Sequence, residues 1–263
     1  MPAQSNSTST WGLPSAPKRA LLLHGLTSTS ASWHRVAEEL AREDFYVIAP
    51  DLIGHGYAAR VSSYAVKDFV EALKPQIESH IGKIDVVVGH SLGGIVALGL
   101  YPYLLGESKK AVRVVLVDPV FKQDEDVKVL VRKEVVAETT APWTVEQYQA
   151  ANPRWTQADC AIKLLGAVLC DSKACELIME HNTPWTFSLP EPSPQADLFI
   201  LGADPALDAC VSLQEHREFA ETRPDVHTGF VKGTTHSVHR EEPEAVVQVI
   251  LQGDISKFRV DTK

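Results

Sequence analysis

The sequence predicts an α/β fold with a mostly parallel central sheet of about six strands, flanked by helices. Two observations lead to this prediction. Apolar runs of strand length alternate with helical patterns, as in sheets whose parallel strands are joined by crossover helices. These runs are continuous in Val, Leu and Ile rather than alternating with polar residues, which is typical of strands covered on both faces.

Four strands are predicted in the first part of the chain, with a helix between consecutive strands. The helix at 32–43 has the clearest pattern, because Trp33, Val36 and Leu40 fall on one face. The predicted strands are 20–24, 46–49, 84–88 and 112–117, and the other two helices are 66–81 and 92–105.

The alternation stops between 120 and 192. This stretch is helical in pattern, for example over 158–169, and it ends in a proline-rich segment at 190–194. The alternation then resumes. The later elements are strands at 197–201 and 226–231, and helices at 213–221 and 243–251.

These patterns divide the chain into three parts. Residues 1–19 are rich in Ser, Thr and Pro, and we expect a flexible tail. Residues 20–119 and 193–263 form the predicted α/β core. Residues 120–192 form a helical segment inserted between two strands of the same sheet.

The composition excludes several classes of protein. The chain has 263 residues, of which 44% are apolar and 22% charged, as in ordinary globular proteins. Its formal net charge of -9 opposes binding to nucleic acids and to anionic lipid. No apolar run approaches the roughly 20 residues of a membrane span, and residues 1–19 lack the apolar region of a secretory signal. We therefore expect a cytoplasmic protein.

No metal and no cofactor is predicted. The four cysteines, at 160, 170, 175 and 210, form no C-x-x-C pair and no zinc spacing, so we expect buried free thiols. His236 and His239 have no third ligand near them in the sequence. A glycine-rich nucleotide loop is also missing. No feature of the sequence indicates an oligomeric state.

The strongest chemical signal is the segment Gly89-His90-Ser91-Leu92-Gly93. This G-x-S-x-G follows a predicted strand and opens a predicted helix, which is the context of a nucleophile elbow. The glycines two residues before and after Ser91 allow a sharp turn that presents the hydroxyl above the sheet edge. We therefore predict that Ser91 is a nucleophile.

A nucleophilic serine needs a base and a carboxylate that orients the base. His236, in the loop after the strand at 226–231, is the predicted base because this elbow is followed by the acid and then by the histidine. His239, three residues further on, is the alternative base. Asp204 and Asp118 both follow predicted strands, and we favour Asp204 because its strand directly precedes that of the histidine. Asp118 remains the alternative acid.

Two backbone amides are predicted to form an oxyanion hole. One is the amide of Leu92, which follows the nucleophile. The other is the amide of Leu26, in the turn His24-Gly25-Leu26 after the first predicted strand. Gly25 is expected to let the backbone approach the substrate closely.

Together these segments resemble the α/β-hydrolase superfamily, in the group that has an H-G-x oxyanion turn and a helical cap. The resemblance covers 20–118 and 196–252 and includes Asp51-Leu52-Ile53-Gly54-His55-Gly56, a turn whose role in the family is structural. It implies a cap inserted after the sixth strand of the family. Family members usually begin with a hairpin before the H-G strand, so the resemblance implies that this hairpin is missing here.

The predicted activity is hydrolysis of a carboxylic ester, a thioester or a lactone through an acyl-enzyme. Relatives of this fold that open epoxides or remove halides use Asp as the nucleophile, so Ser91 disfavours those reactions. Three of the five tryptophans, Trp143, Trp155 and Trp185, fall in the inserted segment and suggest a lipophilic or aromatic substrate. The alternatives are a ligand receptor on a hydrolase scaffold and an acyltransferase or C–C bond hydrolase using the same triad.

Overall fold

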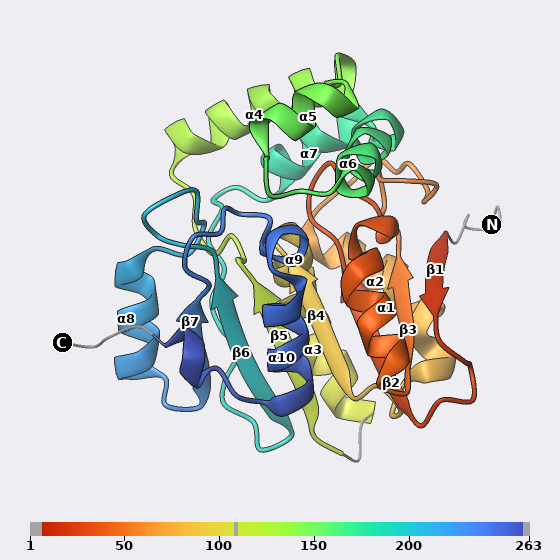
Figure 1. The fold of residues 1–263 in the computed structure, drawn as a ribbon, viewed down its shortest axis with the longest axis vertical. Coiled ribbons are helices and arrows are strands. Elements are labelled where there is room, and N and C mark those ends of the chain that lie inside the picture. The colour runs from red at the N-terminus through yellow and green to blue at the C-terminus, as the bar shows by residue number, and fades with distance from the viewer. Residues whose placement is uncertain (1–6, 108–109, 260–263) are drawn as a thin grey trace.

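The protein is built around a seven-stranded sheet, seen in the computed structural model, which describes residues 7–107 and 110–259 (Figure 1). The strand order across the sheet is β1-β3-β2-β4-β5-β6-β7. The strands are β1 Thr8–Trp11, β2 Lys18–Leu23, β3 Phe45–Pro50, β4 Val86–His90, β5 Val112–Val117, β6 Ala196–Gly202 and β7 Val226–Phe230.

The predicted fold class is confirmed. Strands β2 to β7 correspond to the six predicted strands, and all their pairings are parallel. The helices between these strands include α1 His34–Arg42, α2 Val66–Ile77, α3 Leu92–Glu107 and α8 Leu213–Thr222, and the last strand is followed by α9 Val238–Glu241 and α10 Pro243–Gln252. Short 3-10 helices cover Ser30–Trp33, Glu78–His80 and Ser256–Phe258.

The expectation of a flexible tail over 1–19 is wrong for β1. Residues Thr8–Trp11 pair antiparallel with β3, and Thr8 lies opposite Pro50. The Ser9 hydroxyl is 2.8 Å from the hydroxyl of Ser30, and Trp11 packs against the core. This edge strand is held by backbone pairing and one partly buried side chain, so its polar, β-branched sequence contains no apolar run to detect. Residues 1–6 lie outside the described residues.

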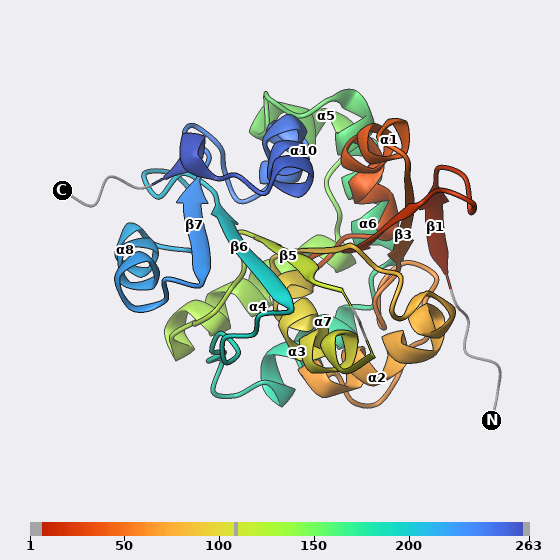
Figure 2. The same ribbon diagram turned by 90° about the horizontal axis from the view of Figure 1, so that it is seen from below.

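Apolar side chains cover both faces of the sheet, which explains the continuous apolar runs. Along β2, Leu21 and Leu23 point into one buried cluster with α2 and α3, whereas Ala20 and Leu22 point into a second cluster with α1 and α10. Figure 2 shows α1 and α10 on one face of the sheet and α2, α3 and α8 on the other.

Four further helices lie together over the carboxyl ends of the parallel strands, at the top of Figure 1. They come from the segment between β5 and β6 and are α4 Glu125–Thr140, α5 Val145–Ala151, α6 Gln157–Leu169 and α7 Ser172–His181. We call them the four-helix layer. None of the described helices is both long enough and apolar enough to cross a bilayer.

The start of α3 packs so closely against β2 that only glycine fits at position 93. A Cβ there would lie 2.2 Å from the carbonyl oxygen of Leu23. We expect Gly93→Ala to lower the free energy of unfolding by at least about 2 kcal/mol, because backbone on both sides must move. Urea unfolding monitored by circular dichroism measures this change.

Gly106→Ala is the matched control for this prediction. Gly106 lies in the same helix, and a Cβ built there meets nothing within 4 Å. This substitution should leave stability unchanged or raise it by up to about 1 kcal/mol, since alanine is the better helix former. Equal effects of the two substitutions would contradict the packing argument.

Candidate active site

Ser91 occupies a strained turn between β4 and α3, as its sequence context predicts. Its φ of 53° lies in the left-handed region, which is rare for a residue with a side chain. The Ser91 amide donates to the carbonyl of Val117 in the neighbouring strand, at 3.0 Å. A Cβ at Gly89 would lie 2.3 Å from the carbonyl oxygen of Gly93, so the turn can close only between two glycines.

The residues that carry the predicted oxyanion amides line the cavity at Ser91. Leu26 and Leu92 line the same cavity as Ser91, and among the described residues neither amide has an intramolecular acceptor. Leu92 begins α3, where helical amides lack partners and the helix dipole is positive. Within the described part of the chain, both amides are therefore available to donate to a new hydrogen-bond partner.

Gly25 serves a different purpose from the predicted one. It does not line the cavity. A Cβ at Gly25 would lie 2.8 Å from Nδ1 of His90 and 3.1 Å from Cβ of Ser91. The glycine therefore lets the turn after β2 approach the Ser91 turn, rather than the substrate.

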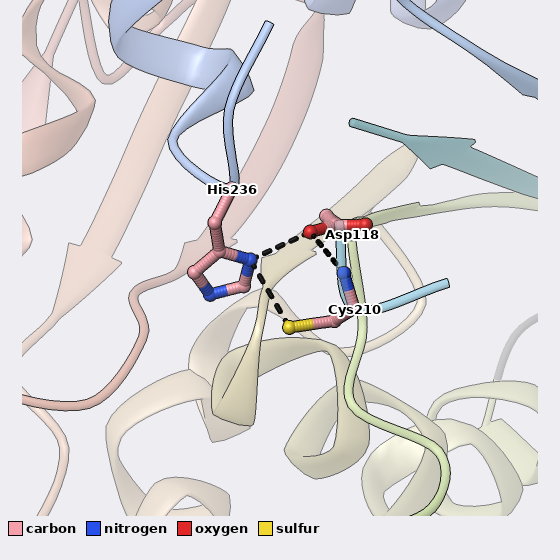
Figure 3. Close-up of side chains that lie close together, drawn as sticks. All are labelled: Asp118, Cys210 and His236. Atoms are coloured by element: carbon pink, nitrogen blue, oxygen red, sulfur yellow. Dashed lines mark hydrogen bonds and ion pairs between the residues drawn. The ribbon is translucent and has the colours of Figure 1, made fainter. Parts of the chain in front are cut away.

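His236 meets its carboxylate partner in Asp118, as Figure 3 shows. The Nδ1–H of His236 donates to Oδ2 of Asp118 at 2.6 Å, and Asp118 is fully buried directly after β5. Asp118 also accepts the amides of Ala203, Cys210 and Val211, so its side chain is fixed in place. Nδ1 thus carries the proton, which leaves Nε2 as the acceptor.

The preference for Asp204 over Asp118 is therefore wrong. The Asp204 carboxylate accepts the amides of Gly233 and Ala206 and so closes its own turn. The physical reason lies in the loop after β7. This loop crosses the end of β6, where the Asp204 amide donates to the carbonyl of Thr234, and it brings His236 back toward β4 and β5.

The Asp118–His236 contact shifts the pKa values of both groups. Burial raises the pKa of the Asp118 carboxyl, but the hydrogen bond and charge of His236 outweigh burial and hold this pKa below its usual value. Burial likewise lowers the pKa of His236, but the Cys210 sulfur and the Asp118 carboxylate raise it well above 6.5. The pair therefore favours a carboxylate next to an imidazole that readily takes a proton.

Ser91 and His236 line one cavity, but no hydrogen bond joins their side chains among the described residues. Such contacts are often loose without substrate and tighten when it binds. His90 helps to position the backbone of His236, because its Nε2–H donates to the His236 carbonyl at 2.9 Å. The rival His239 is buried between His90 and Trp33, and burial and His90 hold its pKa well below 6.5.

The cavity above Ser91 has a volume of about 290 Å³ and mostly apolar walls. Two of the predicted aromatic residues, Trp155 and Trp185, line it. Trp143 does not. It is half exposed and lines an adjoining hollow of about 680 Å³ that shares Trp155 with the cavity.

Helix α6 of the four-helix layer rests directly on the candidate oxyanion turn. Nζ of Lys163 donates to Oγ1 of Thr27 at 2.6 Å and to the Glu138 carboxylate at 2.8 Å. One helical turn later, a Cβ at Gly166 would lie 2.8 Å from the carbonyl oxygen of Thr27. Thr27 itself has a φ of 51°. The inserted segment therefore touches the turn that carries the Leu26 amide.

A second buried cation, Arg240 of α9, joins the core to the same helix. It donates to the carbonyl of Asp159 at 3.0 Å, and its guanidinium lies 4.9 Å from the Trp155 ring centroid. Burial lowers the pKa of Arg240 to about 10, so it stays charged at neutral pH. Sequence reasoning did not identify Lys163, Arg240 or Cys210, because none lies in a motif.

The four cysteines are free thiols, three of them buried, as expected. Cys210 is the exception because it is partly exposed and lies 3.4 Å from Nδ1 of His236. Within residues 7–107 and 110–259, Asp118, Cys210 and His236 form the one group whose atoms are close enough to hold a metal ion together.

A family model described as the alpha/beta hydrolase family matches residues 20–249. The chain belongs to the alpha/beta hydrolase family. The lipase LipV of Mycobacterium tuberculosis is 32% identical over 150 residues, which cover 56% of this hydrolase and 54% of the lipase. The chain thus aligns with about half the length of that curated relative.

Solved structures share the fold of this hydrolase at low sequence identity. A thermophilic esterase from Thermogutta terrifontis has a TM-score of 0.68 and 19% identity, covering 94% of this chain and 92% of the esterase. An enol-lactonase from Burkholderia xenovorans has a TM-score of 0.69 and 15% identity, covering 95% and 96%. At these identities the likeness shows the fold alone.

The pairing of His236 with Asp118 predicts how the imidazole titrates. Asp118→Asn should lower the pKa of His236, because the buried negative charge that favours the imidazolium is removed. Asp204→Asn is the matched control and should leave that pKa nearly unchanged. Ring ¹⁵N shifts of His236 followed against pH measure both. If Asp204→Asn lowered the pKa of His236 and Asp118→Asn did not, Asp204 would be the partner of His236.

Proposed function

We propose that this protein is a serine hydrolase that cleaves a carboxylic ester, a thioester or a lactone. The observation that carries the proposal is the buried Asp118–His236 pair, whose imidazole opens into the same cavity as the strained Ser91 turn. A nucleophile, an oriented base and free amide donors within one cavity are the parts that acyl transfer requires.

In the proposed reaction, the Ser91 hydroxyl attacks the acyl carbon while Nε2 of His236 takes its proton. Asp118 keeps the other ring proton on Nδ1 and stabilises the imidazolium that forms. His236 then gives the proton to the leaving alkoxide or thiolate. A water molecule attacks the acyl-enzyme with His236 as base, and the acid is released.

The amides of Leu26 and Leu92 hold the oxyanion of the tetrahedral intermediate. Both lack an intramolecular acceptor within the described part of the chain, so no hydrogen bond must break when the charge develops. Preorganised donors of this kind lower the barrier by roughly 3–4 kcal/mol each. The positive end of α3 adds to the same stabilisation.

The four-helix layer acts as the cap in this proposal and supplies the apolar walls. Trp155, Met179 and Trp185 come from the layer and the segment that follows it, and they face the cavity. We therefore propose a lipophilic or aromatic substrate. The names of LipV, a lipase, and of the esterase and enol-lactonase structures agree with an ester or lactone substrate.

Loss of the proposed catalytic groups should abolish turnover. Ser91→Ala and His236→Ala should each lower kcat by about six orders of magnitude. Asp118→Asn should lower it by about four, because the ring loses its tautomer. Asp204→Asn is the control and should keep most of the activity if it folds. A fluorophosphonate that labels Ser91 in the parent, but not in Ser91→Ala, tests the nucleophile directly.

The pH dependence follows from the raised pKa of His236. The base must be neutral, so kcat/KM should rise with pH through that raised value. Asp118→Asn should shift this acid limb to lower pH. A profile in which Asp118→Asn leaves the limb in place would contradict the role of Asp118.

Substrate class is tested with a panel of short, long-chain and aromatic esters. Val135 of α4 lines the cavity, so Val135→Asp should raise KM for lipophilic esters about tenfold and change KM for a small acetate less. Val129→Asp is the control, since Val129 lies on the same helix but is 48% exposed and outside the cavity. Faster turnover of small polar acetates throughout the panel would contradict a lipophilic substrate.

A further inference from the structure

Two side chains from separate segments, Asp118 and Cys210, converge on Nδ1 of His236 (Figure 3). Oδ2 of Asp118 lies 2.6 Å from Nδ1, and Sγ of Cys210 lies 3.4 Å from it. The nitrogen, the sulfur and the oxygen all lie within 4.8 Å of one another. The proposed mechanism assigns a role to the Asp118 carboxylate but none to the Cys210 thiol.

We propose that Asp118, Cys210 and His236 form an inhibitory site for a thiophilic divalent cation such as Zn²⁺, which shuts off the base by binding Nδ1. One imidazole nitrogen, one thiolate and one carboxylate are all ordinary zinc ligands. The two anionic ligands neutralise the charge of the ion. The site shares Asp118 and His236 with the proposed triad, but the proposed reaction itself needs no metal.

The existing separations are close to those of a tetrahedral zinc site. Ordinary Zn–N and Zn–S bonds at a tetrahedral angle hold the nitrogen and sulfur about 3.6 Å apart. The observed distance from Nδ1 of His236 to Sγ of Cys210 is 3.4 Å. The nitrogen and the carboxylate oxygen would have to separate to about 3.3 Å. The proposal therefore requires the His236 side chain to rotate slightly into the cavity that it lines.

The ion can enter from the cavity, and a fourth ligand can come from water there. Cys210 and His236 both line the cavity, whereas Asp118 is fully buried beneath them. Three protein ligands with one open position are common where zinc is accessible to solvent. The amides of Ala203 and Val211 continue to orient the other carboxylate oxygen of Asp118.

The proton balance explains why binding inhibits. The Cys210 thiol releases its proton to solvent and becomes a thiolate. Neutral His236 keeps one ring proton, which moves from Nδ1 to Nε2 when the metal takes the Nδ1 lone pair. Nε2 then carries a hydrogen and cannot accept the proton of Ser91. The metal also takes the Asp118 oxygen that held the active tautomer, and no group is oxidised or reduced.

Inhibition in this form rests on the proposed function of His236, but binding of the ion does not. Two measurements therefore separate the claims. The first is cadmium titration followed by the ultraviolet absorption of the cadmium–thiolate bond, which needs no catalysis. The second is the rate of ester hydrolysis, and of fluorophosphonate labelling of Ser91, with and without zinc.

The decisive variant is Cys210→Ser. Loss of a direct ligand should weaken cadmium and zinc binding at least as much as the roughly 10- to 100-fold loss seen for outer partners. The zinc inhibition constant is compared with each variant's own zinc-free rate, so a change in basal activity does not enter. Removal of zinc with EDTA should restore the rate in the parent.

Cys170→Ser is the matched control. Cys170 is a second thiol that could bind cadmium, because its sulfur lies 3.5 Å from that of Cys175. Neither of these cysteines belongs to the group formed by Asp118, Cys210 and His236. This variant should keep both the zinc inhibition and the cadmium signal of Cys210. If Cys170→Ser removes the inhibition and Cys210→Ser does not, the proposal is overturned.

The outcomes distinguish this proposal from the proposed function. Cadmium binding that depends on Cys210, in a protein that neither hydrolyses esters nor labels at Ser91, supports the metal site and refutes the hydrolase. Ester hydrolysis that zinc leaves unchanged supports the hydrolase and overturns the metal site. Zinc inhibition that persists unchanged in Cys210→Ser also overturns it, because the ion then binds elsewhere.

Discussion

The site depends on one backbone contact, in which the turn after β2 lies directly against the turn between β4 and α3. This contact exists because Gly25 and Gly93 lack side chains: a Cβ at Gly93 would lie 2.2 Å from the Leu23 carbonyl, and one at Gly25 would meet His90. The contact places Leu26 and Ser91 along the same cavity. Backbone N–H donors that are fixed before the reaction need not reorganise when charge develops. This is why a preorganised site stabilises that charge better than water does.

The strand order then determines which groups reach the serine. β5 lies beside β4, and the Ser91 amide is bonded to the carbonyl of Val117 at the end of β5. The next residue, Asp118, is thus a near neighbour of Ser91, whereas Asp204 lies one strand further away, after β6. The histidine loop starts from the sheet edge at β7 and must cross the end of β6 to reach the serine. His236, which this loop carries, therefore contacts the Asp118 carboxylate at the end of β5.

This geometry also explains how far the sequence alone could lead. The six parallel strands were predictable because burial on both faces leaves continuous apolar runs, and Ser91 was predictable because the elbow demands small residues at fixed spacing. The choice between Asp118 and Asp204 depends on the path of a loop through space, which no local pattern records. β1 left no signal, because an edge strand is stabilised by backbone pairing. Lys163 and Cys210 reach the site only through tertiary packing.

The contacts of α6 with the core bear on how such a site admits its substrate. Tyr148 and Lys163 both donate to the Glu138 carboxylate within the four-helix layer, so the Lys163–Glu138 charges would stay paired if the layer moved as a unit. Displacing α6 would break the Lys163–Thr27 bond and the Arg240 bond to the Asp159 carbonyl. Charge-assisted bonds of this kind contribute about 1.5–3 kcal/mol each. Displacement of α6 would therefore also release Thr27, the neighbour of Leu26, from its bond to Lys163.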